Sequence, residues 1–386
     1  MDAKIIKFSN ENKTMRIFTA IGIILIVAGH LQCDVFSFLG YFPYYSFHVM
    51  IFLFVSGYFI SPKADLKKFI LRKVRRLLIP YFIFNLIYGI LSTFLNYKGI
   101  YVGQGISIYN LFIAPFLGGH QFMFNSPAWF VPALFVTEVV YLVSSQLLNL
   151  MLKVLDDERR NLLVDMILLL GYLVLGIIAV ALAIGGHAWG FYKTIGRWLL
   201  MLPFISLGRV YKAYIQGKIR AVARRLINKG FSVYLLYALY FVVVILGQII
   251  LVKNTEGLNI SVVWCTSFGN GPIIPFIAAC LGMAFWYGVA SVCARIPNVE
   301  PVLAIGRHSY AVMTHHLFFL FVINSICLRF CNNSESFDLT RYGTDIFYQY
   351  MYLGDVLTPV VNLIICVAVP VLIGVLWRKM RQYVKI

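Results

Sequence analysis

Charged residues are scarce in this chain, and acidic residues are scarcer still. Only 12% of the 386 residues are charged, with 15 Asp or Glu against 33 Lys or Arg, whereas 61% are hydrophobic and the mean hydropathy is +0.83. Soluble domains have an apolar fraction of roughly 45–50%. The shortage of charge therefore excludes an ordinary soluble globular protein, and we expect an integral membrane protein.

Cysteine patterns and long polar stretches are missing as well. The seven cysteines form no CxxC pair and show no Cys/His metal spacing, so the sequence indicates neither a disulfide framework nor a metal site. The longest polar stretches, near 98–126 and 329–356, are shorter than the roughly 50 residues that an independent domain needs. We expect one membrane domain over residues 1–386, with short cytoplasmic tails at 1–15 and 378–386. The first apolar run lacks a small-residue cleavage site, which indicates a retained helix.

Apolar runs long enough to cross a bilayer recur along the chain. A spanning helix needs about 17–25 mostly apolar residues, and we expect ten of them. An even number places both ends on one side, and the Lys and Arg residues that flank the first and last runs favour the cytoplasm. The sequence thus predicts an all-α polytopic membrane helix bundle with both termini cytoplasmic. The runs are 16–33, 42–60, 79–97, 127–150, 162–185, 196–211, 231–252, 273–294, 304–328 and 357–377.

Positive charge is confined to alternate segments between these runs. The expected inner segments are rich in Lys and Arg, whereas each expected outer loop has two at most. A net charge of +18 could indicate nucleic-acid binding, but this alternation is the positive-inside pattern of membrane topology. We therefore expect contact with membrane lipids and no nucleic-acid partner. The outer loops include 34–41, 98–126, 253–272 and 329–356.

Several ionisable side chains lie inside apolar runs, where burial in hydrocarbon is costly. His30, His48 and His316 fall at similar depths by helix counting, which permits a shared site; the alternative is that each ring bonds a backbone carbonyl. For His315 the carbonyl interpretation is favoured. Glu138 is the only carboxylate deep in a span, and it either orients a histidine or makes a structural hydrogen bond as a neutral acid.

Cationic side chains at the inner surface form a second candidate site. Arg16 and His30 are 14 positions apart, so they share one helix face and are separated by roughly 20 Å along the axis. A ligand that enters from the cytosol could reach from one side chain to the other. The alternative is that Arg16 only anchors the helix at the inner surface and His30 is a polar cap near the outer surface. The stretch 67–80 predicts a short basic amphipathic element, suited to phosphates or to anionic lipid headgroups. Its candidate ligands are Arg72, Lys73, Arg75 and Arg76.

Five short motifs occur in a fixed order between Arg16 and His316. They are Val27-Ala28-Gly29-His30, Phe47 to Tyr58 with its Ser-Gly-Tyr ending, Arg72 to Pro80-Tyr81, Pro127 to Val131 with its Trp-Phe pair, and Gly306 to Tyr310 followed by His316. Taken together, they resemble membrane acyltransferase family 3, the multi-pass bacterial O-acetyltransferases of surface and capsular polysaccharides. Two positions depart from the family pattern: Thr19 stands where the first-helix Arg is usual, with Arg16 one turn earlier, and Met313 stands where a Tyr precedes the late His.

The resemblance implies transfer of an acyl group, most often acetyl, from a cytoplasmic acyl-CoA to a hydroxyl of a glycan or its lipid-linked precursor in the bacterial cytoplasmic membrane. Acyl-CoA is then a donor substrate, and no tightly bound cofactor is expected. His30 would activate the hydroxyl or relay the acyl group, with His316 or His48 assisting. The four cations of the basic stretch would hold donor phosphates, and Trp129, Ser309 and Tyr310 would line the acceptor cavity.

Two other functions fit the same composition. A transporter or exporter of a glycan or small molecule also has about ten helices with buried polar groups. The basic stretch before Pro80-Tyr81 and the lack of a visible repeat between the two halves favour the enzyme. A non-catalytic partner in an envelope assembly would tolerate replacement of the histidines.

Overall fold

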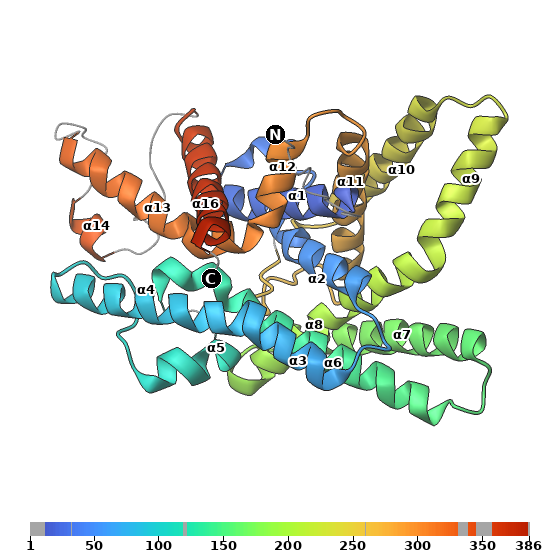
Figure 1. Ribbon diagram of the computed structural model, residues 1–386, viewed down its shortest axis with the longest axis horizontal. Coiled ribbons are helices and arrows are strands. Elements are labelled where there is room, and N and C mark those ends of the chain that lie inside the picture. The colour runs from blue at the N-terminus through green and yellow to red at the C-terminus, as the bar shows by residue number, and fades with distance from the viewer. Residues whose placement is uncertain are drawn as a thin grey trace.

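The computed structural model describes residues 12–31, 33–118, 122–258, 260–330, 339–344 and 357–384, and these residues are almost entirely helical (Figure 1). Most of the expected tail 1–15 and of the loop 329–356 lies outside the described residues, whereas 378–384 of the other expected tail are helical and continue α16. The helices are α1 (Lys13–His30), α2 (His48–Phe59), α3 (Leu66–Lys73), α4 (Ile79–Tyr97), α5 (Ala114–Leu117), α6 (Phe130–Met151), α7 (Asp157–Ile184), α8 (Gly190–Val210), α9 (Gln216–Asn228), α10 (Val233–Lys253), α11 (Ile274–Cys293), α12 (Glu300–Arg307), α13 (Ser309–Phe330), α14 (Leu339–Thr344) and α16 (Leu357–Val384).

Eight of the described helices are long and apolar enough to cross a bilayer, which confirms the prediction of a helical multi-pass membrane protein. The two remaining predicted runs, 42–60 and 196–211, correspond to α2 and α8. The apolar element that contains α2, Tyr44–Phe59, is too short for the same criterion, and α8 is interrupted by charged and polar residues. The number of ten spans and the side of the termini stay predictions.

Helix α1 lies at the centre of the bundle and packs against α2, α11, α12, α13 and α16. Figure 1 shows it crossing the middle of the molecule, with α13 and α16 to one side and α11 and α10 to the other. Its sequence is apolar on nearly every face, as expected for a helix surrounded by protein. The Asn12 side chain caps it by accepting a hydrogen bond from the Met15 N–H at 3.1 Å. Arg16 and His30 are therefore held at opposite ends of a buried, rigid element.

Helices α2 and α8 approach closely enough for their backbones to touch. A Cβ atom added at Gly57 would lie 1.9 Å from the carbonyl oxygen of Ile205, and one added at Gly208 would lie 2.0 Å from that of Phe54. Small residues permit this kind of contact between membrane helices, where van der Waals packing drives association. The crossing fixes α2, which carries His48, relative to α8.

The basic stretch is not a separate surface element, contrary to the sequence prediction. Helix α3 continues through one π-helical turn, η3 (Val74–Leu78), directly into α4, so that 66–97 is a single long element (Figure 1). Pro80 has no N–H to donate, and the Ile79 N–H reaches the Val74 carbonyl five residues back. The cations of this stretch therefore lie at the end of a spanning helix.

The predicted span 304–328 is also divided differently in the structure. His308 adopts φ −107° and ψ 17°, which ends α12, and α13 begins at the next residue. Gly306, at the end of α12, packs directly on α1, because a Cβ there would lie 2.3 Å from the Arg16 carbonyl oxygen. The break lets α12 follow α1 while α13 carries His316 past the far end of the same helix.

Replacing Gly57 or Gly208 by Ala should separate α2 from α8, since the neighbouring backbone cannot move aside as a flexible side chain would. Overpacking of this kind costs about 1–3 kcal/mol or more, so the thermal melting temperature of the purified protein should fall. The matched control is Gly171→Ala in α7, where nothing lies within 4 Å of the added Cβ. That change should leave melting unchanged or raise it. Equal melting of all three variants would contradict the close α2–α8 contact.

Candidate functional site

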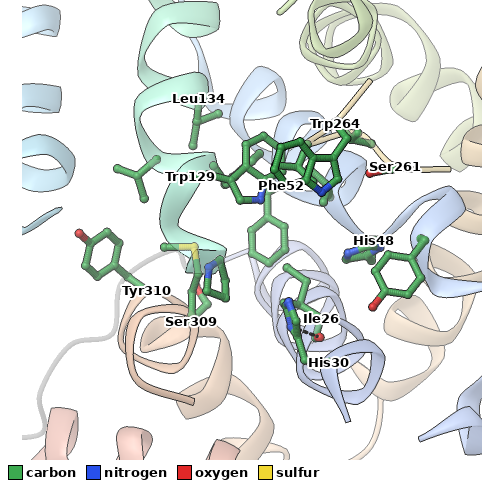
Figure 2. A pocket seen from close by; sticks show the side chains of 18 of the residues that line it. Ile26, His30, His48, Phe52, Trp129, Leu134, Ser261, Trp264, Ser309 and Tyr310 are labelled. Carbon is green, nitrogen blue, oxygen red and sulfur yellow. Dashed lines mark hydrogen bonds between the residues drawn. The ribbon is translucent and has the colours of Figure 1, made fainter. Parts of the chain in front are cut away.

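The described residues enclose two neighbouring cavities. The first, the histidine cavity, has a volume of about 400 Å³ and is lined by His30, His48, Trp129, Ser309 and Tyr310 among others (Figure 2). The second, the basic cavity, is larger, at about 1180 Å³. Six cations and the single carboxylate of Glu138 are found among the described residues that line it. The cations are Arg16, Arg72, Lys73, Arg76, Arg307 and Arg378.

Three apolar side chains line both cavities and separate them. They are Phe52 of α2, Leu77 of η3 and Leu134 of α6, which we call the partition. In Figure 2 Phe52 lies between the Trp129 side chain and the end of α1 that carries Ile26 and His30. A ligand that occupied both cavities would have to pass these three side chains.

His30 and His316 form a hydrogen-bonded pair between α1 and α13. The Nε2 of His316 lies 3.2 Å from the Nδ1 of His30, and the ring centroids are 5.1 Å apart. The Nδ1 of His316 is 2.8 Å from the Val312 carbonyl oxygen, which can only accept, so in a neutral ring this nitrogen carries the proton. The Nε2 of His316 is then the acceptor in the pair.

The same reasoning assigns the tautomer of His30. Its Nδ1–H is shared between the His316 Nε2 and the Ile26 carbonyl oxygen, 2.9 Å away. The proton of a neutral imidazole is thereby placed on Nδ1, and the His30 Nε2 keeps a free lone pair. His30 lines the histidine cavity, whereas His316 is 1% exposed and lies behind it. His30 is therefore the member of the pair that can act as a base.

His48 brings a second imidazole to the cavity from the start of α2. Its Nδ1 bonds the Tyr44 carbonyl oxygen one turn earlier, so its Nε2 is also left as an acceptor when the ring is neutral. The neighbouring Tyr45 ring packs edge-on at 5.3 Å, and its hydroxyl donates to the Gly29 carbonyl at 3.0 Å. The carbonyl hydrogen bonds that we considered as an alternative to a site are present, and they orient the rings.

His315 contacts a tyrosine hydroxyl and not the backbone carbonyl that the sequence favoured. Its Nδ1 is 2.7 Å from the Tyr88 hydroxyl, and its ring packs against Phe84 of α4. It is not among the residues that line either cavity. We assign it a packing role between α13 and α4.

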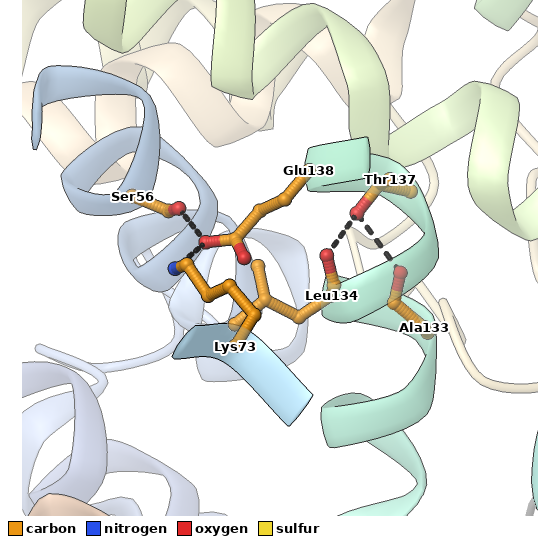
Figure 3. Close-up of polar contacts among 6 residues, drawn as sticks. All are labelled: Ser56, Lys73, Ala133, Leu134, Thr137 and Glu138. Carbon is orange, nitrogen blue, oxygen red and sulfur yellow. Dashed lines mark hydrogen bonds and ion pairs between the residues drawn. The ribbon is translucent and has the colours of Figure 1, made fainter. Parts of the chain in front are cut away.

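The structure does not bring Glu138 to the histidines, so the expectation that it orients one of them is wrong. Its Oε1 forms an ion pair with the Lys73 Nζ at 2.5 Å and accepts a hydrogen bond from Ser56 (Figure 3). Glu138 is 1% exposed, and the pairing offsets the cost of burying its charge. These contacts tie together α2, α3 and α6, the segments beside the partition, and they neutralise Lys73.

Arg16 occupies the basic cavity despite its departure from the family position. Its Nη1 donates to the Gly306 carbonyl at 3.2 Å, which holds the guanidinium against α12. Thr19, which holds the usual position of the family arginine, also lines the cavity, but its hydroxyl bonds the Met15 carbonyl at 2.9 Å. The positive charge that α1 contributes to the lining of the cavity thus comes from Arg16.

The remaining predicted residues divide between the two cavities. All three arginines of the basic stretch are exposed, but only Arg72 and Arg76 line the basic cavity, and Arg75 lines neither cavity. Trp129, Ser309 and Tyr310 line the histidine cavity, and the Tyr310 hydroxyl donates to the Leu77 carbonyl at 3.3 Å.

Several lining residues had no signal in the sequence. The partition consists of ordinary apolar residues. Arg307 was noted only as part of the motif from Gly306 to Tyr310, and Arg378 only as one of the cations that follow the last apolar run. The segment 260–264 covers the histidine cavity although its loop is almost free of charge. Only the packing of distant helices identifies these groups.

Comparison with known proteins gives one family. The model of the family described as acyltransferase domain, acyltransferase family 3, matches residues 17–379. No curated protein and no solved structure matches the chain. Because the family match covers nearly the whole chain, the chain belongs to acyltransferase family 3 and is a multi-pass membrane acyltransferase.

Proposed function

We propose that the protein transfers an acyl group, most simply acetyl, from cytoplasmic acyl-CoA to a hydroxyl of a surface or capsular glycan or its lipid-linked precursor, in the bacterial cytoplasmic membrane. One observation carries the proposal. A cavity rich in cations and a cavity with two neutral, acceptor-ready imidazoles meet at a thin apolar partition. Membership in an acyltransferase family favours acyl transfer over the export function that the sequence left open.

The donor has a shape that suits two joined cavities. Coenzyme A carries its phosphates at one end of an extended arm and its thioester at the other. Arg16, Arg72 and Arg76 offer charge-assisted hydrogen bonds to the phosphates in the basic cavity. The thioester would then pass Phe52 and Leu134, so that its carbonyl carbon enters the histidine cavity. The apolar partition keeps water away from the bond that is to be broken.

His30 would act as the general base on the acceptor. Its Nε2 takes the hydroxyl proton while the oxygen attacks the thioester carbonyl, and the C–O bond forms as the C–S bond breaks. The proton then passes from the imidazolium to the departing thiolate, which restores neutral His30. During the step the Nδ1–H of His30 stays bonded to the His316 Nε2 and the Ile26 carbonyl, which stabilise the positive ring. The Nε2 of His48 accepts a second hydrogen bond and orients the acceptor.

Trp129 supplies the binding surface for the sugar. Its ring lines the histidine cavity together with Ser309 and Tyr310, whose hydroxyls are suited to hydrogen bonds with glycan hydroxyls. A flat aromatic face beside a few polar groups is typical of small-molecule pockets. The acceptor would therefore approach from the side opposite to the donor.

Replacing His30 by Ala should reduce acyl transfer by about 10²–10⁴-fold, the usual contribution of a positioned base. The measurement is incorporation of radiolabelled acetyl from acetyl-CoA into glycan. The protein is supplied in nanodiscs, and membrane vesicles supply the native acceptor. His187→Ala, in an exposed segment between α7 and α8, is the matched control and should retain full activity. A fully active His30→Ala variant would remove His30 from the mechanism.

Arg72→Gln and Arg76→Gln should each raise the KM for acetyl-CoA by roughly 10- to 100-fold, the range expected for loss of a hydrogen bond to a charged group. Arg75→Gln, one exposed cation away on the same element, should leave KM unchanged. Acetyl-pantetheine, which has the thioester but no phosphates, should show no difference among these variants. Equal effects at all three positions, or the same loss with acetyl-pantetheine, would place the donor phosphates elsewhere.

A further inference from the structure

Arg197 is a fully buried cation with no hydrogen-bond partner among the described residues. It is 0% exposed, and its Nε, Nη1 and Nη2 atoms all lack a partner. A guanidinium always carries its charge in proteins and has five N–H groups to satisfy. Burying such a group without a counter-charge is strongly unfavourable. A side chain of this kind in the middle of α8 needs an explanation.

Two other deeply buried charges among the described residues each have a counter-charge within the chain. Glu138 pairs with Lys73, and Asp165 of α7 lies 3.3 Å from the Arg209 Nε and accepts a hydrogen bond from the Tyr214 hydroxyl at 2.8 Å. Both carboxylates come from neighbouring helices and are almost fully buried. Arg197, unlike these two carboxylates, has no counter-charge within the described part of the chain. This difference points to a counter-charge from outside the chain.

The location of Arg197 indicates where that counter-charge binds. Its guanidinium carbon lies 5.2 Å from the centroid of the Trp129 ring, and Trp129 lines the histidine cavity. One turn earlier on α8, the Lys193 Nζ lies 4.8 Å from the centroid of Trp264, which lines the same cavity (Figure 2). Two cations therefore stand beside two aromatic walls of the cavity in which we place the acceptor.

The aromatic contacts alone do not account for these cations. A tryptophan ring face attracts a cation that stacks on it. It does not accept hydrogen bonds from the N–H groups that lie in the plane of a stacked guanidinium. No Asp or Glu occurs among the described residues that line the histidine cavity. An anion bound beside Trp129 would lie within about one Debye length, roughly 8 Å, of the guanidinium, in surroundings with little solvent to screen it.

We propose that the histidine cavity takes an anionic acceptor, whose carboxylate or phosphate oxygens supply the counter-charge of Arg197. This inference rests on the proposed function and specifies its substrate class: an acidic sugar or a sugar phosphate in place of a neutral glycan. Neither cation is among the residues that line the cavity, so each acts on the anion through space: Lys193 from beside Trp264 and the fully buried Arg197 from beside Trp129. The hydroxyl to be acylated then lies toward His30.

Matched sugars that differ only in charge test the proposal. Binding of methyl glucuronide, glucose 6-phosphate and methyl glucoside to the full-length protein in nanodiscs would be measured by calorimetry. The wild type should bind the two anions at least about tenfold more tightly than the glucoside, as expected for an attraction of this size. Arg197→Met should remove that preference, and Arg197→Lys should keep part of it. Lys98→Met, an exposed cation in another outer segment, should change nothing.

The outcomes separate the sources of the anion. A preference for the glucuronide indicates an acidic sugar, and a preference for glucose 6-phosphate indicates a phosphorylated acceptor. The proposal is overturned if the wild type does not prefer either anion, if the preference survives in Arg197→Met, or if inorganic phosphate alone binds as tightly as both. Folding of Arg197→Met is judged by its thermal melting in the presence of acetyl-CoA. If this variant does not fold, Lys193→Met and Arg197→Lys replace it, and each should reduce the preference for the anions. The binding measurement does not require acyl transfer. Failure of the proposed acyl transfer would therefore appear in the radiolabel assay and not in the calorimetry.

Discussion

The hydrogen bond between His30 and His316 is the interaction on which the chemistry of this site depends. It joins the central helix α1 to α13, and together with the Val312 and Ile26 carbonyls it fixes which nitrogen of each ring carries a proton. Without the fixed proton on Nδ1, the His30 ring could present a donor to the cavity, and a hydroxyl would meet no base. Backbone carbonyls one turn earlier determine the tautomers, so the helical geometry itself prepares the reactive nitrogen.

The second constraint is the arrangement of charge around that pair. Cations gather at the N-terminal end of α1, where Arg16, Arg72 and Arg76 line the basic cavity, and the Glu138–Lys73 ion pair holds together the helices beside the partition. The histidine cavity is in contrast apolar, apart from its imidazoles and a few hydroxyls. The partition therefore separates a region that attracts phosphates from one in which a neutral base is stable. A substrate with a charged end and an uncharged thioester end matches this division.

Much of the fold follows from the sequence, because hydrocarbon imposes strict rules on length and polarity. Apolar runs and the alternation of Lys and Arg predicted a helical membrane protein, the positions of His30 and His48 inside such runs marked them as candidates, and the resemblance to a family supplied Trp129. The rest depends on which helices are neighbours. The partner of Glu138 lies 65 positions away, on an element expected to be separate from the membrane, and the π-turn before Pro80 that makes α3 and α4 continuous has no simple signature. Arg197 looked only like a polar interruption of a short run until the structure showed what surrounds it.

The most direct test is a structure of the protein in nanodiscs with a non-hydrolysable acetyl-CoA analogue in which a methylene group replaces the thioester sulfur. We expect the analogue's phosphates beside Arg72 and Arg76, its arm between Phe52 and Leu134, and its acyl carbonyl in the histidine cavity, where an attacking hydroxyl bonded to the His30 Nε2 would stand about 3–3.5 Å from the carbonyl carbon. An analogue bound with its acyl group outside that cavity, or with an unbroken partition between it and His30, would contradict the account.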